Sequence, residues 1–182
     1  MKIYDCFMFF DEEMLLDLRL NIMNKYVDKF VITEATYMHS GRPKKLLFDI
    51  NKFSKFKDKI IYNVVDKEPP DIETIYEEDK DEKDTRGQKL VNNSNKREHF
   101  QREMAQESLK VLAEANPEDI ILINDVDEIP NLDEINFNTI NKKLIFFKQK
   151  MFFYKFNLQH EEMTWVGSRA CKKKDFISPQ WM

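Results

Sequence analysis

The strongest constraint on the fold comes from residues 120–130, IILINDVDEIP. Four consecutive apolar residues open this stretch, without the apolar–polar alternation of a strand that has one wet face. Such a run is typical of a central strand in a parallel sheet, covered on both faces. The run then ends in Asp125, Asp127 and Glu128. Because ligands of open α/β sheets bind beyond the carboxyl ends of the strands, these acids mark the candidate site.

Other segments supply the remaining elements of an α/β fold. The helical spacing of apolar residues such as Met14, Leu18 and Ile22 predicts a helix over 11–26, and a second apolar stripe predicts one over 93–115. We expect strands at 2–9, 29–35, 59–65, 120–124, 143–156 and 164–173, the last two antiparallel. The sequence therefore predicts one α/β domain over residues 1–182, with a mixed, mainly parallel sheet flanked by helices and a β-rich C-terminal part.

The segment 66–84, DKEPPDIETIYEEDKDEKD, differs in composition from its surroundings. Its two prolines and dense charge predict an exposed loop. One interpretation is a solvated connector. The other is a flap over a site, because long loops in compact domains are often functional.

Composition excludes several classes of protein. The three glycines, Gly41, Gly87 and Gly167, stand too far apart for a G-x-G-x-x-G loop, a P-loop or a G-x-S-x-G turn. The two cysteines form no C-x-x-C pair, which argues against structural zinc. A net charge of -4 gives no general attraction to nucleic acid. Acids interrupt the apolar N-terminus, which fits neither a signal peptide nor a transmembrane segment, so we expect a cytoplasmic location.

The acids after the apolar run suit a divalent cation. In an extended backbone, Asp125 and Asp127 would point to the same side of the chain, where their charges repel. Mg²⁺ or Mn²⁺ is the natural counter-charge, and such ions take few protein carboxylates and complete their shell with phosphate oxygens and water. The alternative is a simple turn, because aspartate is common at strand ends.

A second polar cluster opens the predicted helix over 93–115. Arg97 and Gln101 share one face, and Glu98 and Arg102 share the adjacent face. Arginine near a helix N-terminus can bind phosphate, although an exposed face with one internal ion pair would look the same. His39 lies in the loop YMHSGRPKK, whose cations could contact a phosphate or a sugar or remain solvated.

Four stretches together resemble glycosyltransferase family 17. They are IYDCFMFFDEEMLLDLRLN, VDKFVITEATYMHSGRPKKLLF, REHFQRE and ILINDVDEIP, in this order, and the resemblance runs from residue 2 to about residue 169. It implies a GT-A-like, nucleotide-sugar-binding Rossmann-like fold. It also implies an inverting transfer of a sugar, expected to be N-acetylglucosamine, from a UDP-sugar to a glycan or glycoconjugate acceptor, assisted by Mn²⁺ or Mg²⁺.

The resemblance also assigns roles to individual residues. Asp127 would hold the metal directly, and Asp125 would contact the ribose or a metal-bound water. Glu161 and Glu162 are the candidate general bases. The other residues expected near the nucleotide sugar are Glu34, Thr36, Arg97, Gln101 and Arg102, and those expected near the acceptor or the sugar are His39, Glu128, Trp165 and Gly167.

Two departures and two rival functions accompany this resemblance. The segment 66–84 diverges locally, and family members continue beyond FISPQWM, so we expect a missing C-terminal segment. One rival is another metal-dependent nucleotidyl or phosphoryl transferase, which two carboxylates would also serve. The second rival is a non-catalytic carbohydrate-binding module. Turnover of a UDP-sugar with one metal would distinguish a glycosyltransferase from both.

Overall fold

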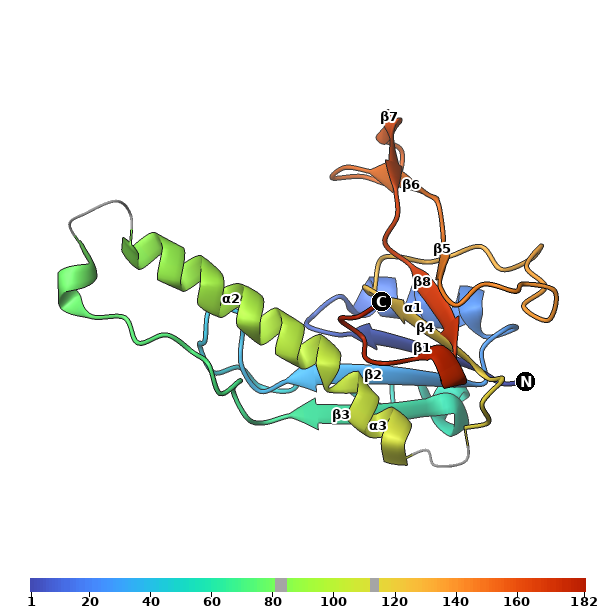
Figure 1. Cartoon of the computed structure of the whole chain (residues 1–182), viewed down its shortest axis with the longest axis horizontal. Helices are drawn as coiled ribbons and strands as arrows, with labels where there is room; N and C mark the ends of the chain where they lie inside the picture. The colour runs from blue at the N-terminus through green and yellow to red at the C-terminus, as the bar shows by residue number, and fades with distance from the viewer. Residues whose placement is uncertain (81–84, 112–114) are drawn as a thin grey trace.

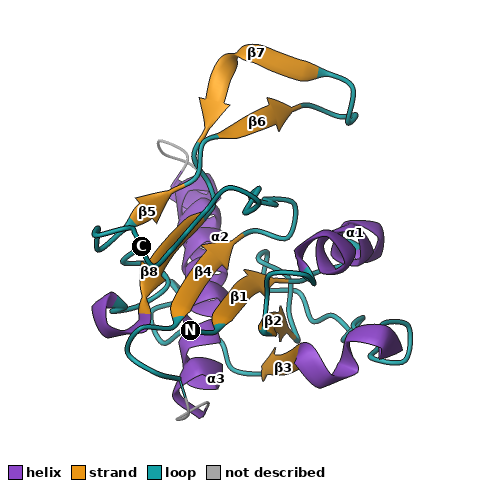
Figure 2. Cartoon of the chain, turned by 90° about the vertical axis from the view of Figure 1, so that its right-hand side faces the viewer, coloured by secondary structure: helices purple, strands orange, loops and turns teal. Residues whose placement is uncertain are grey.

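A six-stranded mixed sheet forms the centre of the computed structural model, which describes residues 1–80, 85–111 and 115–182. The strand order is β3-β2-β1-β4-β8-β5 (Figure 2). Strands β1 to β4 pair in parallel, whereas β8 runs antiparallel to both β4 and β5. The strand bounds are Ile3–Met8 (β1), Lys29–Ala35 (β2), Ile60–Val65 (β3), Ile120–Asn124 (β4), Ile145–Phe146 (β5) and Arg169–Lys172 (β8). The expected mixed, mainly parallel α/β sheet is confirmed.

Helices cover both faces of this sheet (Figure 2). All five residues of β4 are buried, as its unbroken apolar run predicts. On one face, Ile120 and Leu122 pack against the helix Glu13–Met23. On the other face, Ile121 and Ile123 pack against the helix Ala105–Val111. The helices and the remaining strands are Glu13–Met23 (α1), Thr85–Glu103 (α2), Ala105–Val111 (α3), the 3-10 turns Ser54–Lys59 (η1), Glu77–Lys80 (η2) and Lys173–Asp175 (η3), and the strands Gln149–Phe152 (β6) and Gln159–Trp165 (β7).

Helix α1 buries a different stripe from the one expected. The core-facing residues are Leu16, Arg19, Leu20 and Met23, whereas Met14, Leu18 and Ile22 are exposed. Leu15 and Tyr26, also expected in the stripe, pack against the core. The other three positions were wrong because adjacent apolar residues permit two stripes. The stripe expected from the sequence leaves Arg19 on the exposed face of the helix. In the structure Arg19 is buried instead, and its charge is paired with an acid on β1.

Helix α2 begins earlier than expected and projects beyond the sheet (Figure 1). The single helix predicted over 93–115 is divided after Glu103 into α2 and α3, and residues 112–114 lie outside the described residues. Near the sheet, Phe100 and Met104 pack against a small cluster that includes Tyr37. The chain between β3 and α2 runs back along the projecting half of the helix (Figure 1). We call residues 66–80 together with 85–96 the arm.

Specific hydrogen bonds hold the two halves of the arm together. Asn93 accepts from the backbone N–H of Glu73 and donates to its carbonyl, both at 2.8 Å. Lys96 donates to the carbonyl of Asp71 at 2.7 Å, and Lys89 pairs with Asp79 at 2.8 Å. The charged segment predicted as an exposed loop is therefore fixed along α2 over its described part; residues 81–84 lie outside the described residues.

Strands β6 and β7 form an antiparallel hairpin that stands away from the sheet (Figures 1 and 2). We call residues 149–165 the hairpin. Its register shifts between Lys150 and Met151, an irregularity that bends the pair. The sequence predicted strands in this β-rich part but not the separation of the hairpin from the sheet. Among the described residues, none of the helices is both long enough and apolar enough to cross a bilayer.

Candidate functional site

The acids after β4 lie in a turn. We call residues 125–128 the acid turn. The backbone N–H of Glu128 donates to the carbonyl of Asp125 at 3.0 Å, which reverses the chain directly after the buried strand. Of the two arrangements considered for these acids, an extended backbone and a turn, the structure has the turn. The turn nevertheless brings both carboxylates to the walls of the same two cavities.

A buried arginine supports the acid turn from beneath. The Arg19 guanidinium is fully buried and pairs with both carboxylate oxygens of Asp5, at 2.6 and 2.9 Å. Its remaining N–H groups donate to three carbonyls of the turn, those of residues 125, 126 and 128, at 3.1, 3.3 and 2.8 Å. Asn124 adds a 2.6 Å hydrogen bond to Asp5. Because the turn's carbonyls are satisfied on the buried side, its backbone shape is fixed by the core.

Glu128 joins the acid turn to the base of the hairpin. One of its carboxylate oxygens accepts from the Trp165 indole N–H at 2.7 Å, and the other accepts from the Asp125 backbone N–H at 2.9 Å. Gly167 allows this approach, because a Cβ at that position would lie 1.7 Å from the same carboxylate. Glu128, Trp165 and Gly167 therefore form one structural unit although they are far apart in the sequence.

Arg102 places a positive charge beside the acid turn. Its guanidinium contacts Asp125 at 2.9 Å and Glu98 at 3.1 Å. Burial by itself would lower the pKa of Arg102, but the neighbouring carboxylates of Asp125 and Glu98 outweigh burial and raise it above its usual value. The guanidinium therefore remains charged and half-buried next to the first aspartate of the turn.

A cavity of about 280 Å³ opens at the carboxyl ends of β1 and β4; we call it the strand-edge cavity. Its wall carries four carboxylates, from Glu12, Glu98, Asp125 and Asp127, and no lysine or arginine among the described residues. His39 and Gln101 supply further polar groups. The complete lining is Met8, Phe9, Phe10, Glu12, Leu15, His39, Glu98, Gln101, Asp125, Val126 and Asp127.

A larger cavity of about 690 Å³ lies between the acid turn, the start of α1 and the hairpin; we call it the hairpin cavity. It shares Leu15, Asp125 and Asp127 with the strand-edge cavity. The two aspartates thus stand at the boundary between two chambers. The complete lining is Met14, Leu15, Asp125, Asp127, Glu128, Gln149, Lys150, Met151, Phe152, Tyr154, Lys155, Phe156 and Trp165.

Comparison with known families decides the identity. A model of Glycosyltransferase family 17 matches residues 1–176, nearly the whole chain. The chain belongs to glycosyltransferase family 17. The resemblance seen in the sequence is thereby confirmed, and the chain is a glycosyltransferase. No curated protein and no solved structure matches the chain.

Two residues expected near the nucleotide sugar of this glycosyltransferase make hydrogen bonds with neighbouring strands and loops instead. The buried Glu34 carboxylate accepts from the Tyr62 hydroxyl at 2.7 Å, from the Leu47 backbone N–H at 2.8 Å and from Lys44. Thr36 donates through its backbone N–H to the carbonyl of residue 65 at 2.9 Å. Neither residue lines the strand-edge cavity or the hairpin cavity. Both fix the loop that follows β2.

Arg97 also serves the scaffold of this glycosyltransferase. Its guanidinium makes a two-pronged contact with Glu68 at 3.0 and 3.2 Å and donates to the carbonyl of His39 at 3.3 Å. Gly41, with a φ of 85°, lies directly against it, because a Cβ there would approach a guanidinium nitrogen to 2.7 Å. Arg97 lines neither cavity, whereas Gln101, one helical turn later, lines the strand-edge cavity.

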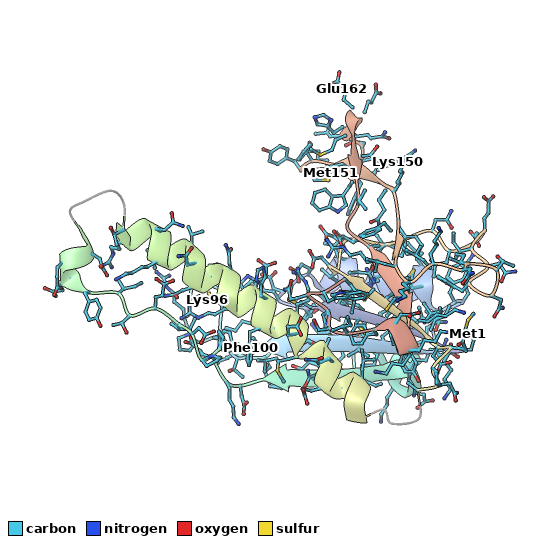
Figure 3. The ribbon with its side chains drawn as sticks, in the orientation of Figure 1. Met1, Lys96, Phe100, Lys150, Met151 and Glu162 are labelled. Carbon is cyan, nitrogen blue, oxygen red and sulfur yellow. The ribbon has the colours of Figure 1, made fainter. Side chains whose placement is uncertain are left out.

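The two candidate bases lie outside both cavities. Glu161 and Glu162 are exposed on β7 and line neither cavity. Figure 3 shows Glu162 on β7 at the upper edge of the hairpin, farther from the sheet than Lys150 and Met151. The carboxylates that the structure does bring to the hairpin cavity are Asp125, Asp127 and Glu128.

Sequence reasoning missed three charged residues of the candidate site. Glu12 follows the carboxyl end of the first strand, which was the available signal. Glu98 was interpreted only as the partner of Arg102. Arg19 sits three residues after Leu16 on the buried stripe, and a charge at such a position indicates a buried partner.

The acid turn suits a cation held by few protein ligands. Within the described residues, no group of three or more His, Cys, Asp or Glu side chains is placed to enclose a metal ion. Asp127 is exposed and makes no hydrogen bond to a described residue, and Asp125 is half-exposed. Two such carboxylates fit Mg²⁺ or Mn²⁺ whose remaining positions are taken by phosphate oxygens and water.

Proposed function

We propose that this glycosyltransferase transfers N-acetylglucosamine from a UDP-sugar to a glycan acceptor in a metal-assisted, inverting reaction on a GT-A-like fold. The observation that carries the proposal is the charge of the strand-edge cavity. Four carboxylates line it without a lysine or arginine among its described lining residues. A nucleoside diphosphate would be repelled from such a wall unless a divalent cation accompanied it.

The donor belongs in the strand-edge cavity, because nucleotides bind at the carboxyl ends of parallel strands. Asp127 and Asp125 are the residues that would hold Mn²⁺ or Mg²⁺, and the bound ion would neutralise the departing diphosphate. His39 and Gln101 line the same cavity and offer polar contacts to the nucleotide. Arg102 contacts Asp125 and adds a fixed positive charge beside the donor.

The acceptor belongs in the hairpin cavity, on the other side of the two aspartates. Reactants bound in chambers that meet at the acid turn would approach each other from opposite sides, which suits a single displacement with inversion. The acceptor hydroxyl must pass its proton to a carboxylate. Glu161 and Glu162 would reach it only after a movement of β7, whereas Glu128 already lines the cavity.

The metal dependence of donor binding tests the proposal. UDP is titrated calorimetrically into the wild type, Asp127→Ala, Asp125→Ala and Asp133→Ala, each with Mn²⁺ and with EDTA. Asp133 is an exposed acid that pairs with Lys25 outside the site and serves as the control. We expect Mn²⁺ to strengthen binding in the wild type and the control, to have no effect in Asp127→Ala, and to have a reduced effect in Asp125→Ala.

A lost charge-assisted contact costs about 1.5–3 kcal/mol, or about tenfold to a hundredfold in affinity. Equal wild-type affinities in Mn²⁺ and EDTA would contradict the metal site. With a UDP-sugar as donor, the products separate the rival functions. Glycosyl transfer releases UDP, nucleotidyl transfer moves the uridylyl group to the acceptor and releases sugar 1-phosphate, and transfer of the sugar phosphate releases UMP. A binding module releases none of these. The donor sugar follows from the relative turnover of UDP-N-acetylglucosamine, UDP-glucose and UDP-galactose, and inversion follows from the anomeric configuration of the product.

A further inference from the structure

The hairpin displays aromatic side chains to solvent. Phe152, Phe156 and Trp165 are 40%, 66% and 40% exposed, and Tyr154 is fully exposed. All four line the hairpin cavity. Aromatic side chains normally contribute to a protein core, so a group of them facing one cavity indicates a surface that binds something.

The backbone at Tyr154 holds its ring outward. Its φ is 59°, the only positive value for a non-glycine residue in the described chain. The backbone N–H of Lys155 donates to the carbonyl of Phe153 at 2.6 Å and closes a tight three-residue turn around Tyr154. This conformation is strained for a bulky residue, and such strain is concentrated where a side chain has to be presented.

The same cavity combines these rings with polar groups. Gln149, Lys150 and Lys155 lie in its wall and offer hydrogen-bond donors. A pyranose has the matching surface: C–H groups on its faces pack on aromatic rings, while hydroxyl groups at its edge take hydrogen bonds. The cavity volume of about 690 Å³ falls within the range of ligand pockets, about 300–1,000 Å³.

We propose that the hairpin cavity is the acceptor subsite and that Phe152, Tyr154, Phe156 and Trp165 form the platform on which a pyranose ring of the acceptor stacks. The proposal rests on the function proposed above. Trp165 has a second role, because its indole N–H is bonded to Glu128 of the acid turn at 2.7 Å. The platform is thereby fixed in position relative to Asp125 and Asp127.

A membrane surface is the competing occupant, because aromatic residues and lysine also mark interfacial segments. Exposed apolar residues of the hairpin outside the cavity, such as Leu158 and Met163, would then contribute equally. The four aromatic rings instead share one cavity with the acid turn, which favours a sugar. Leu158 therefore provides the matched control, since it is 49% exposed and does not line the cavity.

Tryptophan fluorescence gives a direct test. The chain has two tryptophans, and Trp181→Phe leaves Trp165 as the sole reporter. A glycan array first identifies oligosaccharides that bind this protein, and each is then titrated in the absence of any donor. We expect saturable changes in Trp165 emission. Phe156→Ala and Tyr154→Ala should weaken binding by about tenfold, while Leu158→Ala leaves it unchanged.

Parallel measurements separate the possible failures. UDP affinity in Mn²⁺ is measured for every variant and should stay constant. If UDP bound normally but no glycan on the array did, or if Phe156→Ala and Tyr154→Ala bound glycans as well as wild type, the subsite proposal would be wrong while the donor site stood. If glycans bound but UDP did not, the donor proposal would fail alone. Sedimentation with phosphatidylcholine–phosphatidylserine vesicles tests the membrane alternative. The hairpin would be assigned to a membrane if wild type sedimented with the vesicles, if Leu158→Ala and Phe156→Ala both lost this sedimentation, and if both variants bound glycans as wild type does.

Discussion

At the scale of single residues, the buried ion pair of Asp5 and Arg19 has the strictest requirement for hydrogen-bonding partners. A charge removed from water is costly unless it is paired and its remaining hydrogen-bonding groups are satisfied. Here Asp5 neutralises the guanidinium, and carbonyls of the acid turn accept its other protons. The core of α1 and the shape of the acid turn therefore depend on the same side chain.

Removing the charge of Asp5 should destabilise the whole protein. Asp5→Asn leaves Arg19 buried without a counter-charge, so we expect the free energy of unfolding to fall by about 3–5 kcal/mol. Urea denaturation followed by circular dichroism measures it. Asp133→Asn, which breaks an exposed pair, should leave the midpoint unchanged. A midpoint for Asp5→Asn within error of the control would show that the pair contributes nothing net.

Glu128→Gln should reduce transfer without unfolding the protein. An amide offers only one oxygen to the two N–H donors, from Trp165 and Asp125, that the carboxylate now accepts. One donor would lose its acceptor, so we expect kcat to fall at least about tenfold, with a shift in Trp165 emission. Unchanged kcat in Glu128→Gln, together with a loss of transfer in Glu161→Gln or Glu162→Gln, would place the essential acid on β7.

At the scale of elements, the arm depends on one buried amide. Asn93 satisfies both backbone groups of Glu73, so Asn93→Ala should release residues 71–76 from α2. We expect faster hydrogen exchange and faster proteolysis there, with exchange in β1 and β4 unchanged. Asn92→Ala removes a 3.3 Å contact with the Glu73 side chain and a 3.1 Å contact with Gln88 inside α2, but neither involves the backbone of Glu73, so this variant should behave like wild type. Equal exchange in the two variants would show that other contacts fix the arm.

The elements that sequence predicts best are those whose signal is local. The strand over 29–35 has the predicted bounds, and β4 is buried along its whole length as its composition requires. The start of α2 at Thr85 was missed because its first turns are polar and packed by the returning segment 66–80, a contact that no short window contains. The stripe of α1 was misassigned for the same kind of reason, since Arg19 is buried only because Asp5 lies on another element.

The candidate site likewise has one part that local sequence patterns predict and another part that they do not. Asp125 and Asp127 follow a recognisable strand, and the structure places both at two cavities. The link between Glu128 and Trp165 joins residues of different elements, so no local pattern predicts its geometry. Glu34 and Arg97 show the converse, because the family resemblance places them near the nucleotide sugar whereas their contacts in the structure are with the surrounding loops.

At the scale of the whole molecule, burial of weak acids sets an alkaline limit on stability. Burial raises the pKa of the Cys171 thiol to about 12 and that of Tyr37 to about 12. In the unfolded chain these groups ionise near their usual values of about 8.5 and 10. Their contribution is therefore complete below about pH 8.5 and is lost as the pH rises towards 12.

We accordingly expect stability to be level around neutral pH and to fall above about pH 9. Each group adds a slope of up to about 1.4 kcal/mol per pH unit between its unfolded and folded pKa values. Chemical denaturation at intervals from pH 7 to 11 measures this decline. The thiols provide an independent check, because burial also raises the pKa of Cys6, and neither cysteine should react with iodoacetamide at pH 8 in the native protein. Rapid labelling of the folded protein, or level stability up to pH 11, would contradict it.

The central position of β1 has a consequence for how the chain is made. Ile3 pairs with Ile120, so β1 receives one of its two neighbours only after the long segment up to β4 has been translated. At about 5–20 residues per second, β1 waits on the order of ten seconds with one edge unpaired. During that time the β1–β2–β3 sheet presents an open apolar edge of the kind that recruits other strands. The nascent polypeptide is therefore most prone to aggregation before β4 emerges, and a chaperone that shields that edge would raise the yield of native protein.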